Sequence, residues 1–188
     1  MFTAMKTTVA TFHKVDPKIV ADCIKKLPIP GGFFNKTLNP SAYASYEDAI
    51  DPEFKLPQRS TYNAAGYDFY YPLRLPVDLY PGDVMVVPTG VCCEFHDPNY
   101  FLSLHLRSSI GIKRNVMLAN TTGIIDADYF EGENNGHIMV ALYNYSDLVF
   151  TLHPGDRFAQ GILMPYAIAT NGNDNATQRT GGIGSTGN

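Results

Sequence analysis

The sequence predicts an all-β fold, a distorted jelly roll or β-barrel, with a short helical insertion near the N-terminus. From Gln58 onward, strand-like runs alternate with Pro, Gly, Asn and Asp turns about every ten residues, which is typical of antiparallel barrels. The 188 residues include 16 Gly and 13 Pro, enough for many turns. Hydrophobic residues make up 45% and charged residues 17%, as in a globular domain with a proper core. The predicted strands cover residues 67–73, 84–95, 100–106, 116–119, 137–143, 148–152 and 158–167.

The region before these strands is predicted to be mixed in structure. Residues 6–13 have the pattern of a short strand, and Asp16 followed by Pro17 is typical of a helix start. Apolar residues at helical spacing then predict a helix over 17–27, and a weak helix is expected near 41–50.

The chain is expected to form a single domain over residues 1–170, interrupted by an insertion at about 15–55. The simpler interpretation of the insertion is that it packs on the barrel or at a subunit edge, and the alternative is a binding site for a protein partner. Residues 171–188 are rich in Gly, Asn and Thr and poor in apolar residues, so we expect a flexible C-terminal arm there.

Charge and composition argue against several classes of function. The net charge is -4 and there is no run of Lys or Arg, so nucleic acid is not an expected partner. No apolar run is long enough to cross a bilayer and no secretory signal precedes the first strand, so no membrane contact and a cytoplasmic location are expected. Cys23, Cys92 and Cys93 include no C-x-x-C pair, and the five histidines are scattered, which predicts buried thiols in a reducing compartment and no dedicated metal cage.

Five polar or glycine-rich segments interrupt or follow the strands, and each alone is a weak signal. The segments lie at residues 64–68, 107–111, 120–129, 155–160 and 179–187. Their order and spacing together resemble the motifs of the homotrimeric dUTPase family, over roughly residues 56–188. The Arg-Ser-Ser form of the second segment and the Arg-Thr-Gly-Gly start of the fifth resemble the branch found in Gram-positive bacteria and their phages.

The resemblance implies hydrolysis of dUTP to dUMP and pyrophosphate, which keeps uracil out of DNA and supplies dUMP for dTMP synthesis. Asp126 matches the family's general base, which deprotonates a water molecule for in-line attack on the α-phosphorus. Two other carboxylates are expected to be structural. Asp128 would hold the hairpin, and Asp156 would form an ion pair with Arg157 near the subunit contacts.

Recognition of uracil and of the sugar is also implied by the resemblance. Asn120 and main-chain groups at Gly123, Ile124 and Ile125 match a β-hairpin that reads uracil. Cytosine reverses the donor and acceptor that uracil presents, and each buried group left unpaired costs about 1–3 kcal/mol. Tyr129 matches a ring that packs against deoxyribose and leaves no room for a 2′-hydroxyl.

The phosphates are expected to meet Arg107, Ser108, Ser109 and Gln160. Arginine offers a planar fork to phosphate oxygens. The family more often has Gly at the position of Ser109, and serine costs little there if its φ is negative. Asp68 matches an acidic residue that helps to place Mg²⁺ through water, and the ion would bridge the phosphates of the substrate.

The C-terminal arm would complete the site as a lid. Arg179 matches a clamp for the γ-phosphate, and the backbone at Gly184 and Ser185 would close over it. Ile183 stands where the family usually has a Phe that stacks on uracil. Losing that aromatic contact forfeits about 1 kcal/mol, so we expect a weaker lid.

Two alternatives remain open from the sequence. The dCTP deaminases share the fold and the Arg-Ser-Ser turn, but their third motif resembles Ile-Asp-Pro-Gly-Trp, and this chain has no Trp. The other alternative is a regulatory protein that binds a partner through residues 15–55. The family resemblance predicts a homotrimer, in which one subunit provides the second and fourth motifs, another the third, and the third subunit the arm.

Overall fold

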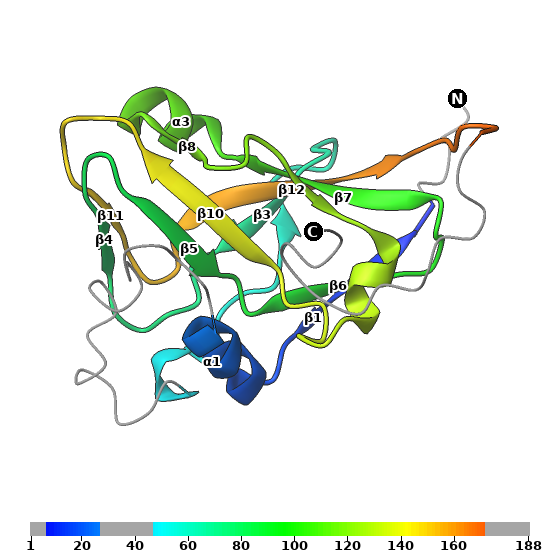
Figure 1. The fold of residues 1–188 in the computed structure, drawn as a ribbon, viewed down its shortest axis with the longest axis horizontal. Helices are drawn as coiled ribbons and strands as arrows, with labels where there is room; N and C mark the ends of the chain where they lie inside the picture. Colours follow the sequence, from blue (N-terminus) through cyan, green and yellow to red (C-terminus); the bar gives the residue numbers. More distant parts are fainter. Residues whose placement is uncertain (1–6, 27–46, 172–188) are drawn as a thin grey trace.

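The structure, a computed structural model, describes residues 7–26 and 47–171. Antiparallel strands form most of the regular secondary structure in this part of the chain, and the short helices lie at its edges (Figure 1). This arrangement confirms the predicted all-β fold class. None of the helices in the described residues has the length and apolar content needed to span a bilayer.

The largest sheet has five antiparallel strands in the order β2–β3–β12–β7–β9. Strands β12 and β7 of this sheet lie side by side across the upper part of the molecule in Figure 1. The strand bounds are Gln58–Arg59 for β2, Tyr67–Tyr70 for β3, Arg157–Pro165 for β12, Tyr100–Leu106 for β7 and Gly123–Ile125 for β9.

Three smaller antiparallel sheets complete the body: β5–β10–β8, β11–β4 and β1–β6. Their strands are β5 (Val84–Pro88), β10 (Met139–Asn144), β8 (Val116–Leu118), β11 (Phe150–Leu152), β4 (Val77–Leu79), β1 (Ala10–Lys14) and β6 (Val91–Phe95).

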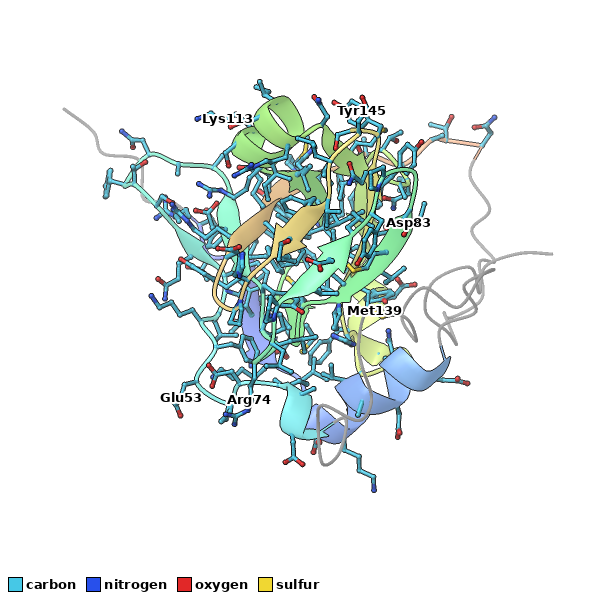
Figure 2. The ribbon with its side chains drawn as sticks, turned by 90° about the vertical axis from the view of Figure 1, so that its left-hand side faces the viewer. Glu53, Arg74, Asp83, Lys113, Met139 and Tyr145 are labelled. Carbon is cyan, nitrogen blue, oxygen red and sulfur yellow. The ribbon has the colours of Figure 1, made fainter. Side chains whose placement is uncertain are left out.

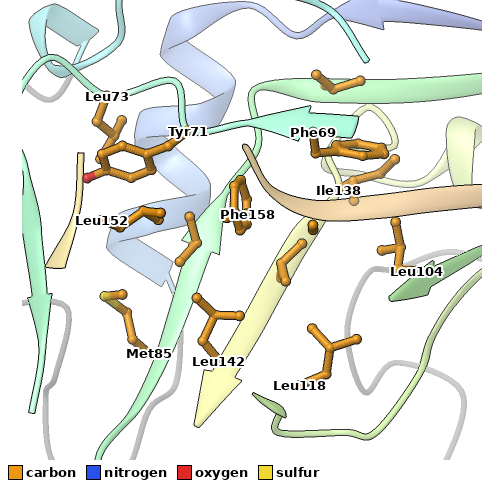
Figure 3. Close-up of a cluster of buried hydrophobic side chains, with 14 of the residues drawn as sticks. Phe69, Tyr71, Leu73, Met85, Leu104, Leu118, Ile138, Leu142, Leu152 and Phe158 are labelled. Atoms are coloured by element: carbon orange, nitrogen blue, oxygen red, sulfur yellow. The ribbon is translucent and has the colours of Figure 1, made fainter. Parts of the chain in front are cut away.

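The core lies where the large sheet faces the smaller ones. Strand β10 alternates between partly exposed and buried side chains, as a strand with one core face should. Leu142 from β10 and Phe158 from β12 are both fully buried and belong to the same cluster, shown in Figure 3. Phe69 and Leu104, from β3 and β7, extend this cluster across the large sheet.

The described ends of the predicted insertion pack on the body. Helix α1 (Pro17–Lys26) begins as expected, because the Asp16 carboxylate accepts a hydrogen bond from the Lys18 amide at 2.8 Å. Val20 of α1 is fully buried, and so is Ala49 of the 3-10 helix η2 (Glu47–Ala49). These contacts fit the simpler interpretation of the insertion for the residues that the structure describes.

Several boundaries differ from those predicted. The expected strand 84–95 is two strands, because Gly90 turns the chain at a φ of 68° and the Phe54 ring leaves no space there for a side chain. The expected strand 67–73 ends at Tyr70. Strand β4 was not predicted, and neither were two short helices, α3 (Ser108–Arg114) and the 3-10 helix η3 (Ala127–Glu131).

Candidate functional site

Polar side chains gather on one face of the large sheet at the end near Arg107, whereas the other face packs into the core. Gln160 of β12 lies opposite Asp68 of β3 on one side and His105 of β7 on the other. Side chains of directly opposed residues project from the same face, so these three form a row. Their neighbours Phe69 and Leu104 point the other way and are buried.

Asp68 is the centre of a charged cluster on this face. Its side chain is only 8% exposed, and its Oδ1 atom lies 3.0 Å from Nε of Arg107. Its Oδ2 atom accepts hydrogen bonds from Arg157 at 3.1 Å and from the Ser60 hydroxyl at 2.5 Å. A buried carboxylate needs such partners, and in return it fixes the directions of both guanidinium groups.

A β-bulge explains how Arg157 reaches this face. The pairing of β12 with β3 shifts register between Arg157 and Ala159, so that an extra residue, Phe158, is accommodated. Both Phe158 and Ala159 are therefore buried, and Arg157 turns to the polar side. Asp156, which we expected to pair with Arg157, instead accepts the His153 amide at 2.9 Å. That expected ion pair was wrong.

Arg107 follows β7 and is the N-cap residue of helix α3. Its carbonyl accepts hydrogen bonds from the amides of Ile110 and Gly111, which starts the helix and leaves the exposed Ser108 and Ser109 on the first turn. Ser109 is not among the described residues with a positive φ, so serine meets no backbone strain there, as expected. Asp68 holds Arg107 through Nε, which leaves the terminal amino groups of the guanidinium for a phosphate.

A pocket of about 800 Å³ opens beside α3. Its lining includes Arg107, Arg157 and two cations from the last turn of α3, Lys113 and Arg114. Figure 2 shows Lys113 at the α3 end of the molecule, far from Glu53 and Arg74. A concentration of positive charge in one concave surface is what a polyphosphate ligand requires.

The Gln160 side chain lies close to this cluster, in space that a neighbouring glycine leaves free. Its Nε2 atom donates a hydrogen bond to the Leu106 carbonyl at 3.4 Å. A Cβ atom added at Gly66 would lie 2.6 Å from Oε1 of Gln160, so the glycine is what allows the amide to lie there. We call Asp68, Arg107, Ser108, Ser109 and Gln160 the Arg107 half-site.

The remaining described candidates lie on the segment 120–129, which we call the Asp126 half-site. Strand β9 packs so closely on β7 that a Cβ atom added at Gly123 would lie 3.1 Å from the Leu104 side chain. Ile125 is buried, whereas the Ile124 side chain is 50% exposed and Asn120 is exposed. The edge that carries these residues therefore faces outward.

Asp126 follows β9 directly and precedes η3. Its side chain is exposed and does not cap the helix, while its carbonyl accepts the Tyr129 amide at 3.1 Å. Asp128 is also exposed and lies in the first turn of η3. Tyr129 is buried, with 4% of its surface exposed. The turn thus presents two carboxylates outward and turns the tyrosine inward.

The two half-sites lie at opposite ends of β7. Ile125 pairs with Leu102, whereas Arg107 follows the other end of the strand. At about 3.4 Å per residue, the separation from Leu102 to Arg107 is about 17 Å. In Figure 1, α3 is at the upper left and the yellow-green turn after β9 is at the right. One chain alone does not bring Asp126 to the phosphate-binding candidates.

The β-hairpin expected around Asn120 was wrong in its pairing. Strand β8, before Asn120, pairs with β10, whereas β9 pairs with β7. The chain instead makes a tight turn after β8, in which the Thr122 amide donates a hydrogen bond to the Asn120 carbonyl at 2.7 Å. Thr121, in the middle of this turn, has a positive φ of 63°. The arm candidates lie outside the described residues: Arg179, Ile183, Gly184 and Ser185.

Sequence reasoning missed some members of the site. Ser60 and Arg157 complete the Asp68 cluster, and Lys113 with Arg114 line the pocket. A Lys-Arg pair four residues after an Arg-Ser-Ser turn is compatible with one helical turn, and that spacing was the available signal. Ser60 and Arg157 gave no such signal, because their places depend on strand register.

An antiparallel β body that gathers arginines and hydroxyls around an open pocket defines a protein that handles phosphate groups. A family model described as dUTPase matches residues 52–187. The chain therefore belongs to the dUTPase family and is an enzyme of the hydrolase class.

Individual relatives agree with this membership. The deoxyuridine 5′-triphosphate nucleotidohydrolase of Aeromonas salmonicida is 37% identical over 121 residues, which cover 64% of this chain and 76% of the relative. The crystal structure of the dUTPase from Streptococcus mutans has 32% sequence identity and a TM-score of 0.57, covering 65% of this chain and 97% of that one.

A third similarity concerns the fold alone. A mutant dUTPase from phage phi11 of Staphylococcus aureus has 21% identity and a TM-score of 0.54, covering 68% of this chain and 94% of that one. Its structure is described as showing how a structural Mg(II) ion is coordinated. Gram-positive and phage proteins are thus among the structures that this chain resembles.

Proposed function

We propose that this chain is a dUTP diphosphatase whose active site joins the Arg107 half-site of one copy to the Asp126 half-site of another in a homotrimer. The observation that carries the proposal is the separation of about 17 Å between the half-sites along β7. Closed threefold symmetry brings one end of a subunit to the other end of its neighbour, three times over.

Asp126 is the proposed general base. An exposed carboxylate directly after a strand end has its oxygens turned to the surface where a neighbouring copy would dock. It holds a water molecule for in-line attack on the α-phosphorus and takes its proton, and the leaving group is pyrophosphate. Asp128 supports the turn.

Arg107, Ser108, Ser109 and Gln160 are the proposed phosphate contacts. The Asp68 carboxylate orients Arg107, so its guanidinium does not have to be ordered when substrate binds. Arg179 of the arm adds a clamp on the γ-phosphate, while Ile183, Gly184 and Ser185 close over the nucleotide.

Mg²⁺ is the proposed cofactor, and the site residues fit it as an outer-sphere ligand set. In the described residues, no group of three or more His, Cys, Asp or Glu side chains could hold a metal. Both oxygens of Asp68 already have cationic partners, so this carboxylate suits a contact through water and not direct ligation. Bound to the phosphates, Mg²⁺ would neutralise part of their charge.

Asn120 and the main chain at Gly123, Ile124 and Ile125 are proposed to read uracil, and Tyr129 to face the deoxyribose. The support is the outward-facing edge of β9, which exposes Ile124, together with a tyrosine fixed one turn away. Main-chain groups in a strand keep a fixed donor and acceptor pattern, which suits discrimination between uracil and cytosine.

A nucleotide panel with Mg²⁺ tests the proposal directly. We expect pyrophosphate release from dUTP and negligible release from UTP, dCTP and dTTP. Analysis of the base after incubation with dCTP separates hydrolysis from deamination, and uracil formed from dCTP would favour the deaminase alternative. Absence of pyrophosphate release from dUTP would overturn the proposed function.

A further inference from the structure

The segment between η3 and β10 folds back underneath Tyr129. Asn135 and Gly136 both adopt a positive φ, of 52° and 65°. A Cβ atom added at Gly136 would lie 2.7 Å from the Phe130 Cα atom and 3.3 Å from the Tyr129 carbonyl oxygen. Only glycine allows so close an approach, so this segment is built to press against η3.

Hydrogen bonds join the segment to the Tyr129 hydroxyl. The hydroxyl donates to the His137 carbonyl at 3.0 Å and accepts from Nδ2 of Asn134 at 2.9 Å. Nδ2 of Asn134 also donates to the same carbonyl at 3.2 Å, which closes a triangle. Because its hydroxyl has two hydrogen-bond partners that are hydrogen-bonded to each other, the ring of Tyr129 has little freedom to tilt.

His137 anchors this triangle to the body of the protein. Its side chain is fully buried, and its Nε2 atom accepts a hydrogen bond from the Gly90 amide at 3.1 Å. That contact assigns the ring proton to Nδ1. The next residue, Ile138, is tied to the Thr89 hydroxyl at 2.7 Å and to the Val91 carbonyl at 2.9 Å. We call the hydrogen-bonded group of Asn134, His137 and the Tyr129 hydroxyl the brace. These contacts attach the brace to the turn between β5 and β6.

The arrangement costs stability. Within the described residues, Oδ1 of Asn134 and Nδ1 of His137 are buried without a hydrogen-bond partner. Each buried polar atom of this kind costs about 1–3 kcal/mol, and apolar side chains of similar size would avoid that cost. Local costs of this kind are expected at positions that serve function more than stability.

We infer that Asn134 and His137 are positioning residues that set how strictly this enzyme excludes ribonucleotides, because they hold the Tyr129 ring against the sugar position. The inference rests on the proposed function, in which Tyr129 faces the deoxyribose. A 2′-hydroxyl is rejected only if the ring cannot move aside. Loosening the brace therefore raises kcat/KM for UTP by a larger factor than it lowers kcat/KM for dUTP.

The test compares kcat/KM for dUTP and UTP in the full-length protein. Asn134→Leu removes both hydrogen bonds at similar volume, and Tyr129→Phe removes the hydroxyl that they hold while keeping the ring. Loss of hydrogen bonds worth about 1 kcal/mol corresponds to about a fivefold to tenfold fall in the dUTP/UTP ratio for either variant. Asn135→Asp, an exposed neighbour whose positive φ suits Asp, is the matched control and leaves the ratio unchanged.

The double variant sharpens the comparison. If both changes act on one brace, Asn134→Leu with Tyr129→Phe lowers the ratio no further than either change alone. A parallel fall in both kcat/KM values at constant ratio would overturn the inference and leave a structural role only. If Asn134→Leu does not fold, Tyr129→Phe carries the same test. A wild-type protein that fails to hydrolyse dUTP would instead overturn the proposed function.

Discussion

The two half-sites at the ends of β7 are built in different ways. The Arg107 half-site is assembled by polar and charged side chains from β3, β12, α3 and the junction between β7 and α3, with Asp68 buried between two arginines. The Asp126 half-site is shaped by backbone, namely the close packing of Gly123 on Leu104 and the turn of η3. The first can be preorganised inside one subunit, whereas the second presents its edge outward.

The difference follows from what each end is proposed to recognise. Phosphates carry fixed charge, so ion pairs formed within one chain can orient the cations before substrate arrives. A base and a sugar are recognised by shape and by the pattern of donors and acceptors, which a strand edge and a braced ring can provide. The half-exposed Ile124 side chain and the exposed Asn120 fit a β9 edge that is open to a nucleotide or to a neighbouring subunit.

The largest expected effect belongs to the Asp126 half-site. Asp126→Asn should lower kcat for dUTP by about 1000-fold or more, because an amide cannot accept the proton from the attacking water. Nucleotide binding, measured with a nonhydrolysable dUTP analogue, should persist. Asp128→Asn is the matched control and should keep most of the turnover. Retained turnover in Asp126→Asn would show that the base lies elsewhere.

Removing the arm should have the next largest effect. Truncation after Gln178 deletes Arg179 and the glycine-rich run, so kcat/KM for dUTP should fall by about 100-fold. The oligomeric state, measured by light scattering, should not change. Normal rates in the truncated protein would show that the arm, with Ile183 in place of Phe, contributes nothing.

A smaller loss is expected at the Arg107 half-site. Arg107→Lys keeps the charge but loses the planar fork that offers Nε to Asp68 and the terminal amino groups to a phosphate, so KM for dUTP should rise about tenfold to 100-fold. Arg74→Lys, at the far end of the molecule, is the control and should leave KM unchanged (Figure 2). Equal KM values for wild type and Arg107→Lys would contradict the fork geometry.

Acid should affect stability through the brace behind the Asp126 half-site. Burial lowers the pKa of His137 to about 3 from the ordinary value of 6.5. The unfolded chain therefore takes up this proton first, so stability falls as pH drops below 6.5 and the loss is complete below about 3. From about pH 7.5 to about pH 4 the contribution is roughly 3 kcal/mol.

Urea unfolding at both pH values measures this contribution. His137→Gln, which can still accept from the Gly90 amide, should lose less stability on acidification than wild type. The exposed His96→Gln is the control and should follow wild type. Identical acid losses in wild type and His137→Gln would show that His137 is not held neutral by burial.

The sequence predicted the parts of the fold that depend on local pattern. Most strands and the start of α1 at Asp16 were predictable from periodicity, turn formers and capping residues. The place of Arg157 was not, because a bulge moves it to the Asp68 face only after β12 pairs with β3. The division of the site between subunits was implied by the family resemblance alone, because local sequence pattern does not reveal the register of β9 against β7.

Subunit complementation tests the divided active site most directly. Arg107→Ala and Asp126→Asn are each expected to have almost no activity alone. If the half-sites come from different copies, co-expressing the two variants should restore activity in roughly a quarter of the sites, because random assembly pairs intact halves at that frequency. Activity in the mixture that stays at the level of the separate variants would contradict a site shared between copies.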